Sequence, residues 1–183
     1  MKNTIILLSG VHGVGKGFYI ANKLNKIDWI TVVSASSIIS EYKPAEDAGY
    51  KKVESVDNNQ GVLLKAFNEC NFDTNIVILD GHLVLLNGLG KIERIPLEFI
   101  QEIHLSGIIL LQDESDAVAE RLKGRDGASL SVETIELIQE NEYRYCQYLS
   151  RNYGIPFLRI SHDESIDSIE LFLQKCEVSN EKQ

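Results

Sequence analysis

A glycine-rich segment near the N-terminus contains the residues best suited to chemistry with phosphate. Residues 10–17 read GVHGVGKG, follow an apolar run at residues 5–8, and precede a helical pattern. Glycines allow the chain to turn so that successive backbone N–H groups point into one concavity, and the N-terminus of the following helix adds partial positive charge. Lys16 supplies a full charge on a mobile side chain. The order strand, glycine loop, helix therefore predicts a loop that binds nucleotide phosphates.

The end of this loop departs from the general phosphate-loop pattern. That pattern closes with Gly-Lys and then Ser or Thr, whose hydroxyl binds Mg²⁺. This chain has Gly17 and then Phe18 after Lys16, so we expect other groups to hold Mg²⁺. The residues predicted to bind the nucleotide are Val11, His12, Gly13, Val14, Gly15, Lys16, Gly17 and Phe18.

An acidic residue ends a second apolar run, NIVILD at residues 75–80. A continuous apolar run of this kind is typical of a central parallel strand. A carboxylate at its end would lie near the nucleotide and hold Mg²⁺, so that the metal bridges the phosphates. The alternative is that Asp80 only begins a turn before Gly81. The next residue, His82, is expected either to contact the substrate or to be a hydrogen-bonded loop histidine.

Arginines form a third candidate group. Arg121 and Arg125 are four residues apart at a helix end and can share one face. Planar, permanently charged guanidinium groups suit the charge that builds on phosphoryl oxygens. The alternative is a basic helix end that complements the helix dipole. Arg144 lies on a later amphipathic helix, and it is interpreted either as an arginine that returns to the phosphates or as a surface residue.

The site of a second substrate is expected after residues 29–34, WITVVS, which are predicted to form the second strand. Ser36 and Ser37 follow that strand and are candidate substrate contacts, with helix capping as the alternative. Lys43, Lys51 and Lys52, in the polar loop that follows, are candidates for supplying charge.

Composition limits the classes of function. A length of 183 residues fits a single domain, predicted over residues 1–176, with a disordered tail at 177–183. The net charge of −9 argues against nucleic acid as a partner and is compatible with a small anionic ligand in a local positive pocket. The three cysteines are widely spaced, which predicts reduced thiols and a cytoplasmic protein. No stretch approaches a membrane span, and the sequence does not indicate an oligomeric state.

Apolar runs alternate with helical patterns along the chain, which predicts an α/β fold with a parallel sheet. The predicted strands are residues 4–9, 29–34, 75–80, 104–112 and 156–161. The predicted helices are residues 16–26, 36–42, 60–70, 96–102, 113–124, 131–152 and 166–176, with loops at 44–59, 81–95 and 125–129.

Three of these segments also resemble a known family. Residues 10–17, 77–81 and 120–125 are similar, in this order, to the GxxGxGKG loop, the VLDG segment and the ERLxGR lid entry of adenylate kinases and related nucleoside monophosphate kinases. The resemblance implies a P-loop nucleoside triphosphate hydrolase-type fold, with a five-stranded parallel sheet flanked by helices on both faces. It also implies that Arg121 packs on adenine and that Arg125 contacts the phosphates. The few residues between Arg125 and the next helix imply a short lid, as in archaeal-type adenylate kinases, which also carry a histidine at the position of His82.

The resemblance implies transfer of the γ-phosphoryl group of Mg·ATP to a nucleoside monophosphate, with loops 44–59 and 125–129 closing to exclude water. Two departures leave alternatives open. Phe18 stands where the family has Thr, and Ser40 stands where it has an arginine for the acceptor. The alternatives are a kinase of another small metabolite and an ATP-dependent switch that acts with a protein partner.

Overall fold

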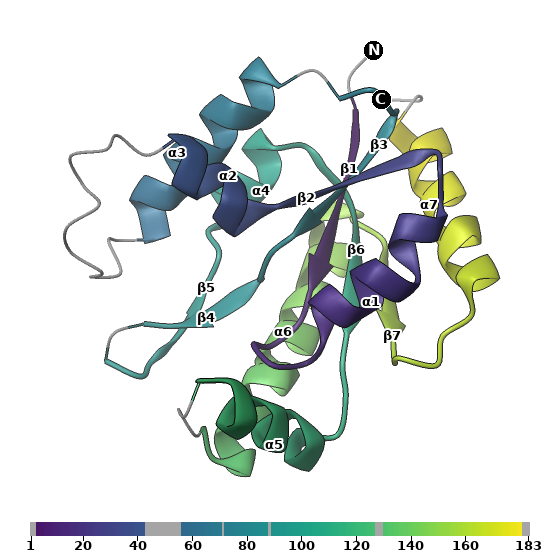
Figure 1. Cartoon of the computed structure of the whole chain (residues 1–183). Helices are drawn as coiled ribbons and strands as arrows, with labels where there is room; N and C mark the ends of the chain where they lie inside the picture. Colours follow the sequence, from purple (N-terminus) through teal and green to yellow (C-terminus); the bar gives the residue numbers. More distant parts are fainter. Residues whose placement is uncertain (1–2, 43–55, 71, 88, 127–129, 181–183) are drawn as a thin grey trace.

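A five-stranded parallel sheet forms the centre of the fold. The computed structural model describes residues 3–42, 56–70, 72–87, 89–126 and 130–180. The strands lie in the order β2-β3-β1-β6-β7, which confirms the predicted α/β class (Figure 1). Their bounds are β1 Thr4–Ser9, β2 Ile30–Ser34, β3 Ile76–Asp80, β6 Leu105–Leu111 and β7 Phe157–Ile160.

The middle of the sheet is buried on both faces. All six residues of β1 are buried, because this strand pairs with β3 on one side and β6 on the other. The register places Leu8 opposite Asp80 of β3 and Ser9 opposite Leu110 of β6. The carboxyl ends of the central strands therefore meet at one edge, where ligands bind in open α/β sheets.

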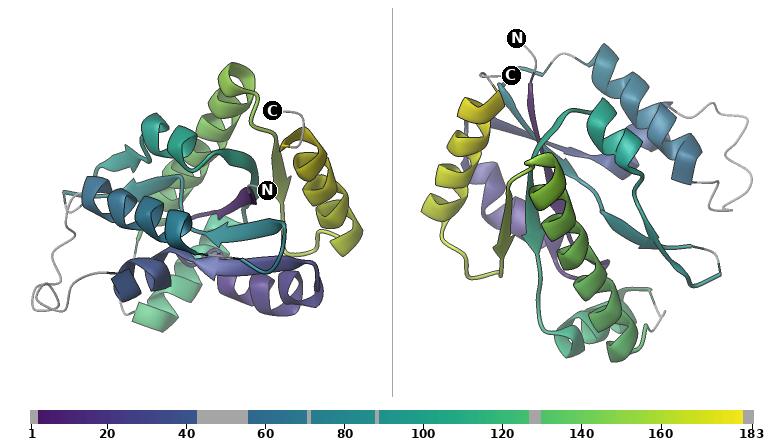
Figure 2. Two further views of the ribbon diagram at one scale, coloured as in Figure 1. Left: turned by 90° about the horizontal axis from the view of Figure 1, so that it is seen from above. Right: turned by 180° about the vertical axis from the view of Figure 1, so that it is seen from behind.

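Helices cover both faces of the sheet. α1 and α7 lie on one face, and α3, α4 and α6 lie on the other, as two further views show (Figure 2). The helices are α1 Lys16–Asn22, α2 Ala35–Tyr42, α3 Val56–Glu69, α4 Leu97–Glu102, α5 Ser115–Asp126, α6 Val132–Tyr153 and α7 Ile166–Asn180, with a 3₁₀ turn, η1, at Leu24–Lys26. Flanking layers of this kind cover a parallel sheet that has no solvated face.

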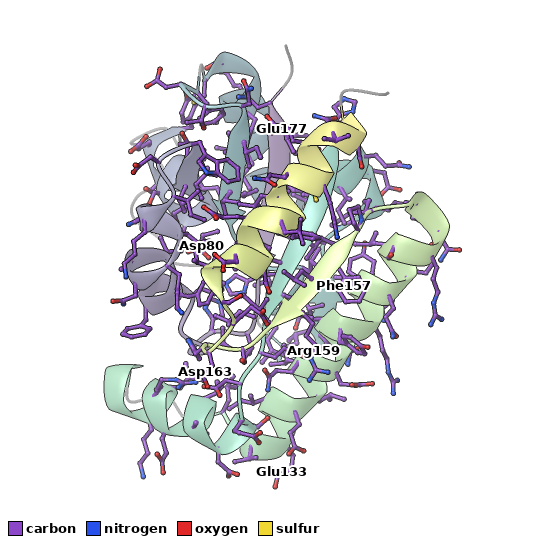
Figure 3. All side chains as sticks on the ribbon, turned by 90° about the vertical axis from the view of Figure 1, so that its right-hand side faces the viewer. Asp80, Glu133, Phe157, Arg159, Asp163 and Glu177 are labelled. Carbon is purple, nitrogen blue, oxygen red and sulfur yellow. The ribbon has the colours of Figure 1, made fainter. Side chains whose placement is uncertain are left out.

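The long helix α6 is fixed at both ends. The side chain of Ser131, the N-cap residue, accepts a hydrogen bond from the backbone N–H of Thr134. Gly154 ends the helix in the left-handed conformation that favours glycine. The edge strand β7 carries Phe157 and Arg159, which are labelled in Figure 3. Both side chains contact the ring of Tyr143 on this helix.

The predicted loop at residues 81–95 is wrong, because these residues contain a two-stranded antiparallel hairpin. β4 (Val84–Leu86) pairs with β5 (Ile92–Arg94). The side chain of Asn87 closes the turn by accepting hydrogen bonds from the backbone N–H groups of Leu89 and Lys91. Each strand has only three residues, too few to show the alternation from which strands are predicted.

Several predicted boundaries also differ. α5 continues through Gly124 to Asp126, because Gly124 does not adopt the positive φ that ends a helix. The first predicted helix divides into α1 and η1, α3 begins at Val56 inside the predicted loop 44–59, and α7 extends through residues 177–180 of the predicted tail. Residues 43–55, 127–129 and 181–183 lie outside the described residues. Within the described part of the chain, no helix combines the length and the apolar composition needed to cross a bilayer.

Candidate active site

The glycine loop at residues 10–17, hereafter the P-loop, joins β1 to α1 at the carboxyl edge of the sheet. Gly13 has φ 81° and Gly15 has φ 100°, both in the region that favours glycine. Space around them is also limited. A Cβ on Gly13 would lie 2.6 Å from Leu122 Cγ, and one on Gly15 would lie 2.6 Å from His162 Cε1. Backbone conformation and packing both fix these two positions as glycine.

The ammonium group of Lys16 is held at the centre of the loop. Its Nζ donates to the carbonyl of Gly10 at 2.9 Å and lies 3.8 Å from Asp80 Oδ1. It also lies 3.5 and 3.4 Å from the two ring nitrogens of His82. The residue is buried although it is charged, which is rare for lysine unless it is paired. The structure therefore brings together three predicted residues, Lys16, Asp80 and His82.

The charge states of these neighbours follow from their surroundings. Burial, the ammonium of Lys16 and the ring of His12 lower the pKa of His82, so the imidazole is neutral at physiological pH. The rings of His12 and His82 lie 4.1 Å apart between centroids. Burial raises the pKa of Asp80, and the charge of Lys16 partly opposes that effect.

Asp80 is the described residue that best fits a role in holding Mg²⁺. Its Oδ1 is buried and makes no hydrogen bond to the described residues. Mg²⁺ in nucleotide sites is commonly bound by one or two carboxylates together with substrate phosphates and water. A carboxylate oxygen beside the P-loop that makes an ion pair with Lys16 but no hydrogen bond to the described residues suits that arrangement. Among the described residues, no group of three or more His, Cys, Asp or Glu side chains is placed to form a metal site from protein ligands alone.

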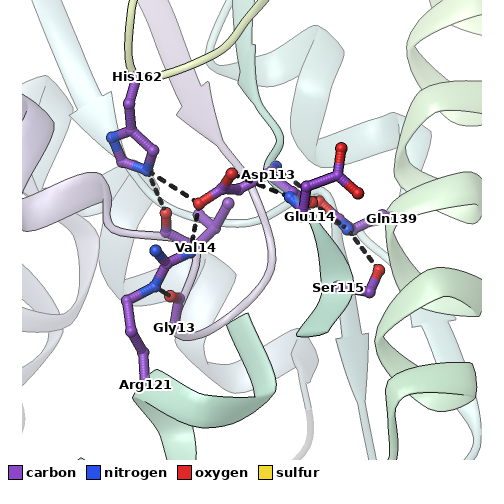
Figure 4. Close-up of polar contacts among 8 residues, drawn as sticks. All are labelled: Gly13, Val14, Asp113, Glu114, Ser115, Arg121, Gln139 and His162. Carbon is purple, nitrogen blue, oxygen red and sulfur yellow. Dashed lines mark hydrogen bonds and ion pairs between the residues drawn. The ribbon is translucent and has the colours of Figure 1, made fainter. Parts of the chain in front are cut away.

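A second polar cluster supports the P-loop from outside (Figure 4). Arg121 donates from Nε to the carbonyl of Gly13 at 2.9 Å and from Nη2 to Asp113 Oδ2 at 2.6 Å. His162 Nε2 lies 2.7 Å from the carbonyl of Val14, and because a carbonyl only accepts, Nε2 carries the hydrogen. Burial opposes ionisation of Asp113, but the hydrogen bond from Arg121 lowers its pKa overall. The cluster therefore holds two carbonyls of the loop, those of Gly13 and Val14.

A buried carboxylate lies behind the loop. The hydroxyl of Ser9, the last residue of β1, donates to Glu142 Oε1 at 2.7 Å and accepts the backbone N–H of Leu83 at 2.9 Å. Glu142 is fully buried, and that burial raises its pKa to about 7 although Ser9 and the charge of Lys16 oppose the rise. These contacts tie α6 to the end of β1 and to the segment between β3 and β4.

One cavity of about 720 Å³ opens beside the P-loop. Its phosphate end contains Lys16, Asp80, His82 and Arg121. We call the other end, which extends between α2, α3, α4 and the β4–β5 hairpin, the acceptor end. The acceptor end is lined by Ile39, Gln60, Leu63, Leu85, Ile95 and Phe99. The size lies within the range of small-molecule sites.

The remaining predicted residues are distributed as follows. Ser36 lines the cavity, whereas Ser37 does not, and the cap of α2 comes from Ser34 Oγ, which accepts the N–H of Ser37 at 3.5 Å. Arg144 is exposed and paired with Glu140 at 2.6 Å, so the structure does not bring it to the cavity. Arg125 is part of α5, and its side chain lies outside the described residues, as do Lys43, Lys51 and Lys52.

In the P-loop, Val14 is fully buried in the core and does not line the cavity. The other predicted nucleotide residues do line it: Val11, His12, Gly13, Gly15, Lys16, Gly17 and Phe18.

Sequence reasoning missed four residues of the site. Asp113 and His162 each follow a strand at the carboxyl edge, and that position was the available signal. Glu142 interrupts the apolar stripe of α6 between Ile138 and Tyr145, so a charge on a buried face was visible in the pattern. Gln60 gave no signal, because a glutamine at a helix start is ordinary.

The chain was compared with protein families, curated proteins and solved structures. The sequence model of a family described as "AAA domain" matches residues 9–139, a span that includes the P-loop, Asp80 and Arg121. No curated protein matches the chain. A solved structure of a gluconokinase from Sinorhizobium meliloti 1021 is similar with 11% sequence identity and a TM-score of 0.49, over 97% of this chain and 93% of that one.

Proposed function

The chain belongs to the AAA domain family, and from this premise we propose that it is an ATP-dependent phosphotransferase that acts on a small molecule. The observation that carries the proposal is the position of Lys16. Its ammonium lies in the P-loop, 3.8 Å from Asp80, at one end of a cavity whose other end has room for a second ligand. A site for a donor nucleotide beside a site for an acceptor is what phosphoryl transfer requires.

In this proposal, different residues bind the phosphates, support the P-loop and hold the metal ion. The N–H groups of the P-loop and Lys16 bind the β- and γ-phosphates, since they supply donors and positive charge at one point. Arg121 and His162 keep the loop in the binding conformation by holding the carbonyls of Gly13 and Val14. Asp80 would hold Mg²⁺, which when bound neutralises phosphate charge. Transfer then depends mainly on positioning and electrostatics.

The narrower proposal, that the acceptor is a nucleoside monophosphate, rests on the resemblance of residues 77–81 and 120–125 to the nucleoside monophosphate kinases. The family match is to an AAA domain and does not single out adenylate kinases. Among the described residues that line the cavity, the lysine and arginine side chains are Lys16 and Arg121, and both contact the P-loop. Observations at the acceptor end therefore favour the alternative of another small-molecule acceptor.

The test is the formation of ADP from Mg·ATP by the purified protein, with and without candidate acceptors. A kinase forms ADP faster in the presence of its acceptor, and the Lys16→Ala variant loses that stimulation. A protein that binds ATP tightly but forms no ADP with any acceptor would contradict the proposal and favour a nucleotide-dependent switch.

A further inference from the structure

We propose that the acceptor is an uncharged alcohol with an apolar body that carries one hydrogen-bond acceptor, recognised by Gln60. This inference rests on the proposed phosphotransferase function and names the substrate class of the same cavity. Against the lining that the described residues provide, phosphorylated and carboxylated acceptors are the less favoured substrates.

The first argument is the apolar lining of the acceptor end. Four elements contribute aliphatic or aromatic side chains to it: Ile39 from α2, Leu63 from α3, Leu85 from β4 and Phe99 from α4. Leu63 and Phe99 are more than nine-tenths buried, so little of their surface faces open solvent. A ligand held among such groups gains free energy by removing apolar surface from water.

The second argument is the distribution of charge. The cations among the described lining residues are at the phosphate end, where Lys16 contacts Gly10 and Asp80, and Arg121 contacts Gly13 and Asp113. An anionic group that moved from water into the acceptor end would lose its hydration. Among the described residues, no cation at that end would pair with it. Burying a charge without a partner is costly, which disfavours a phosphate or carboxylate there.

The third argument is an unsatisfied donor at the acceptor end. Gln60 lines the cavity, is 9% exposed, and its buried Nε2 has no hydrogen-bond partner among the described residues. A buried amide that lacks a partner is destabilising unless a ligand supplies one. A carbonyl oxygen or a ring nitrogen on the acceptor would accept this hydrogen bond without bringing charge.

The proposed step is a balanced phosphoryl transfer. The hydroxyl oxygen of the acceptor forms a bond to the γ-phosphorus of ATP as the bond between that phosphorus and the β–γ bridging oxygen breaks. ADP leaves with the electron pair of the broken bond, the hydroxyl proton passes to water, and the product is a phosphate monoester.

The test compares matched acceptors with the purified protein and Mg·ATP labelled at the γ-phosphate. The panel pairs adenosine, cytidine and thymidine with their 5′-monophosphates, and adds 3-hydroxymethylpyridine as a neutral alcohol and gluconate as an anion. We expect label in a monoester of a neutral member, with kcat/KM at least about tenfold above that of every anionic member, a difference of about 1.4 kcal/mol.

A pair of glutamine variants tests the recognition residue. Gln60→Leu should raise the KM of the neutral acceptor about tenfold or more while leaving the KM of Mg·ATP unchanged, because only the acceptor loses a hydrogen bond. Gln174→Leu, on the exposed surface of α7, is the matched control and should leave both constants unchanged.

Preferred transfer to a monophosphate or to gluconate would overturn the acceptor proposal and leave the phosphotransferase standing. Equal behaviour of Gln60→Leu and Gln174→Leu would overturn the role of Gln60. Absence of transfer to every member, with ATP binding retained, would contradict the phosphotransferase proposal itself, and the acceptor proposal would fall with it.

Discussion

The hydroxyl of Ser9 donates a hydrogen bond to Glu142 Oε1 at 2.7 Å, although 133 residues separate the two in the sequence. Ser9 is the residue directly before the P-loop, and Glu142 lies in the middle of α6, the helix that follows α5 and its Arg121. The contact therefore couples the start of the P-loop to the helical layer on one face of the sheet. Because both residues are fully buried, the charge state of Glu142 affects the free energy of unfolding.

The free energy of unfolding should depend on pH through Glu142. Its folded pKa is about 7, above the ordinary value of 4.5, so between these values the folded state binds a proton that the unfolded state does not. Stability from this group is then fully present below pH 4.5 and is lost as the pH rises towards 7, by roughly 3 kcal/mol. Denaturant unfolding of wild type and Glu142→Gln from pH 4.5 to 8 measures the effect, and the variant should show a flatter profile.

Glu136→Gln is the control for that series, because Glu136 is exposed on the same helix. It should follow the wild-type pH profile. A Glu142→Gln profile parallel to that of wild type would show that Glu142 is not the group responsible.

Replacement of the P-loop lysine should abolish most activity. Lys16→Ala removes the charge that the phosphates need and also removes the cation beside Asp80. We expect kcat/KM for phosphoryl transfer to fall roughly 10²–10³-fold, comparable to the loss of one preorganised donor at a reacting centre. Lys26→Ala, an exposed lysine in η1, should retain wild-type activity. Comparable activity in the two variants would remove Lys16 from the mechanism.

The fork geometry of Arg121 should matter more than its charge. Arg121 contacts the carbonyl of Gly13 and the carboxylate of Asp113 at once, which a lysine ammonium cannot reproduce with the same planar donors. We expect Arg121→Lys to weaken Mg·ATP binding about tenfold, as measured by calorimetry. Arg151→Lys, an exposed arginine on α6, serves as the control. Wild-type affinity in Arg121→Lys would mean that positive charge alone suffices at this position.

A methyl group at position 15 should disturb the loop. Gly15→Ala imposes a side chain at φ 100° and places its Cβ 2.6 Å from His162 Cε1. We expect lower thermal stability and weaker ATP binding in this variant, because both the loop and its supporting histidine must shift. Gly61→Ala, in α3 with no atom near its added Cβ, should instead stabilise the protein by about 0.5–1 kcal/mol. Equal melting temperatures for the two variants would contradict the strain attributed to Gly15.

The framework of the site was predictable because its signals are local. The run before Gly10, the glycine spacing and Lys16 together indicated strand, loop and helix, and the structure has β1, the P-loop and α1 at these places. Asp80 was predictable for the same reason, since an acid ending a continuous apolar run indicates the carboxyl edge of a central strand.

The supporting contacts were not predictable because they join distant segments. His162 and Val14 are 148 residues apart, and Arg121 and Gly13 are 108 apart. No spacing rule connects such pairs before the strand order is known. Arg144 was left between two interpretations for the same reason, and its side chain pairs with Glu140 on the surface.

The most direct test of the account follows the γ-phosphorus of Mg·ATP by ³¹P nuclear magnetic resonance in the presence of the acceptor panel. The account predicts a new phosphate monoester signal that grows with ADP and is absent with Lys16→Ala. Signals of ADP and inorganic phosphate alone would identify a hydrolase, and unchanged ATP with every acceptor would identify a binding protein. Either of these results would contradict the proposal that this chain transfers phosphate to a small molecule.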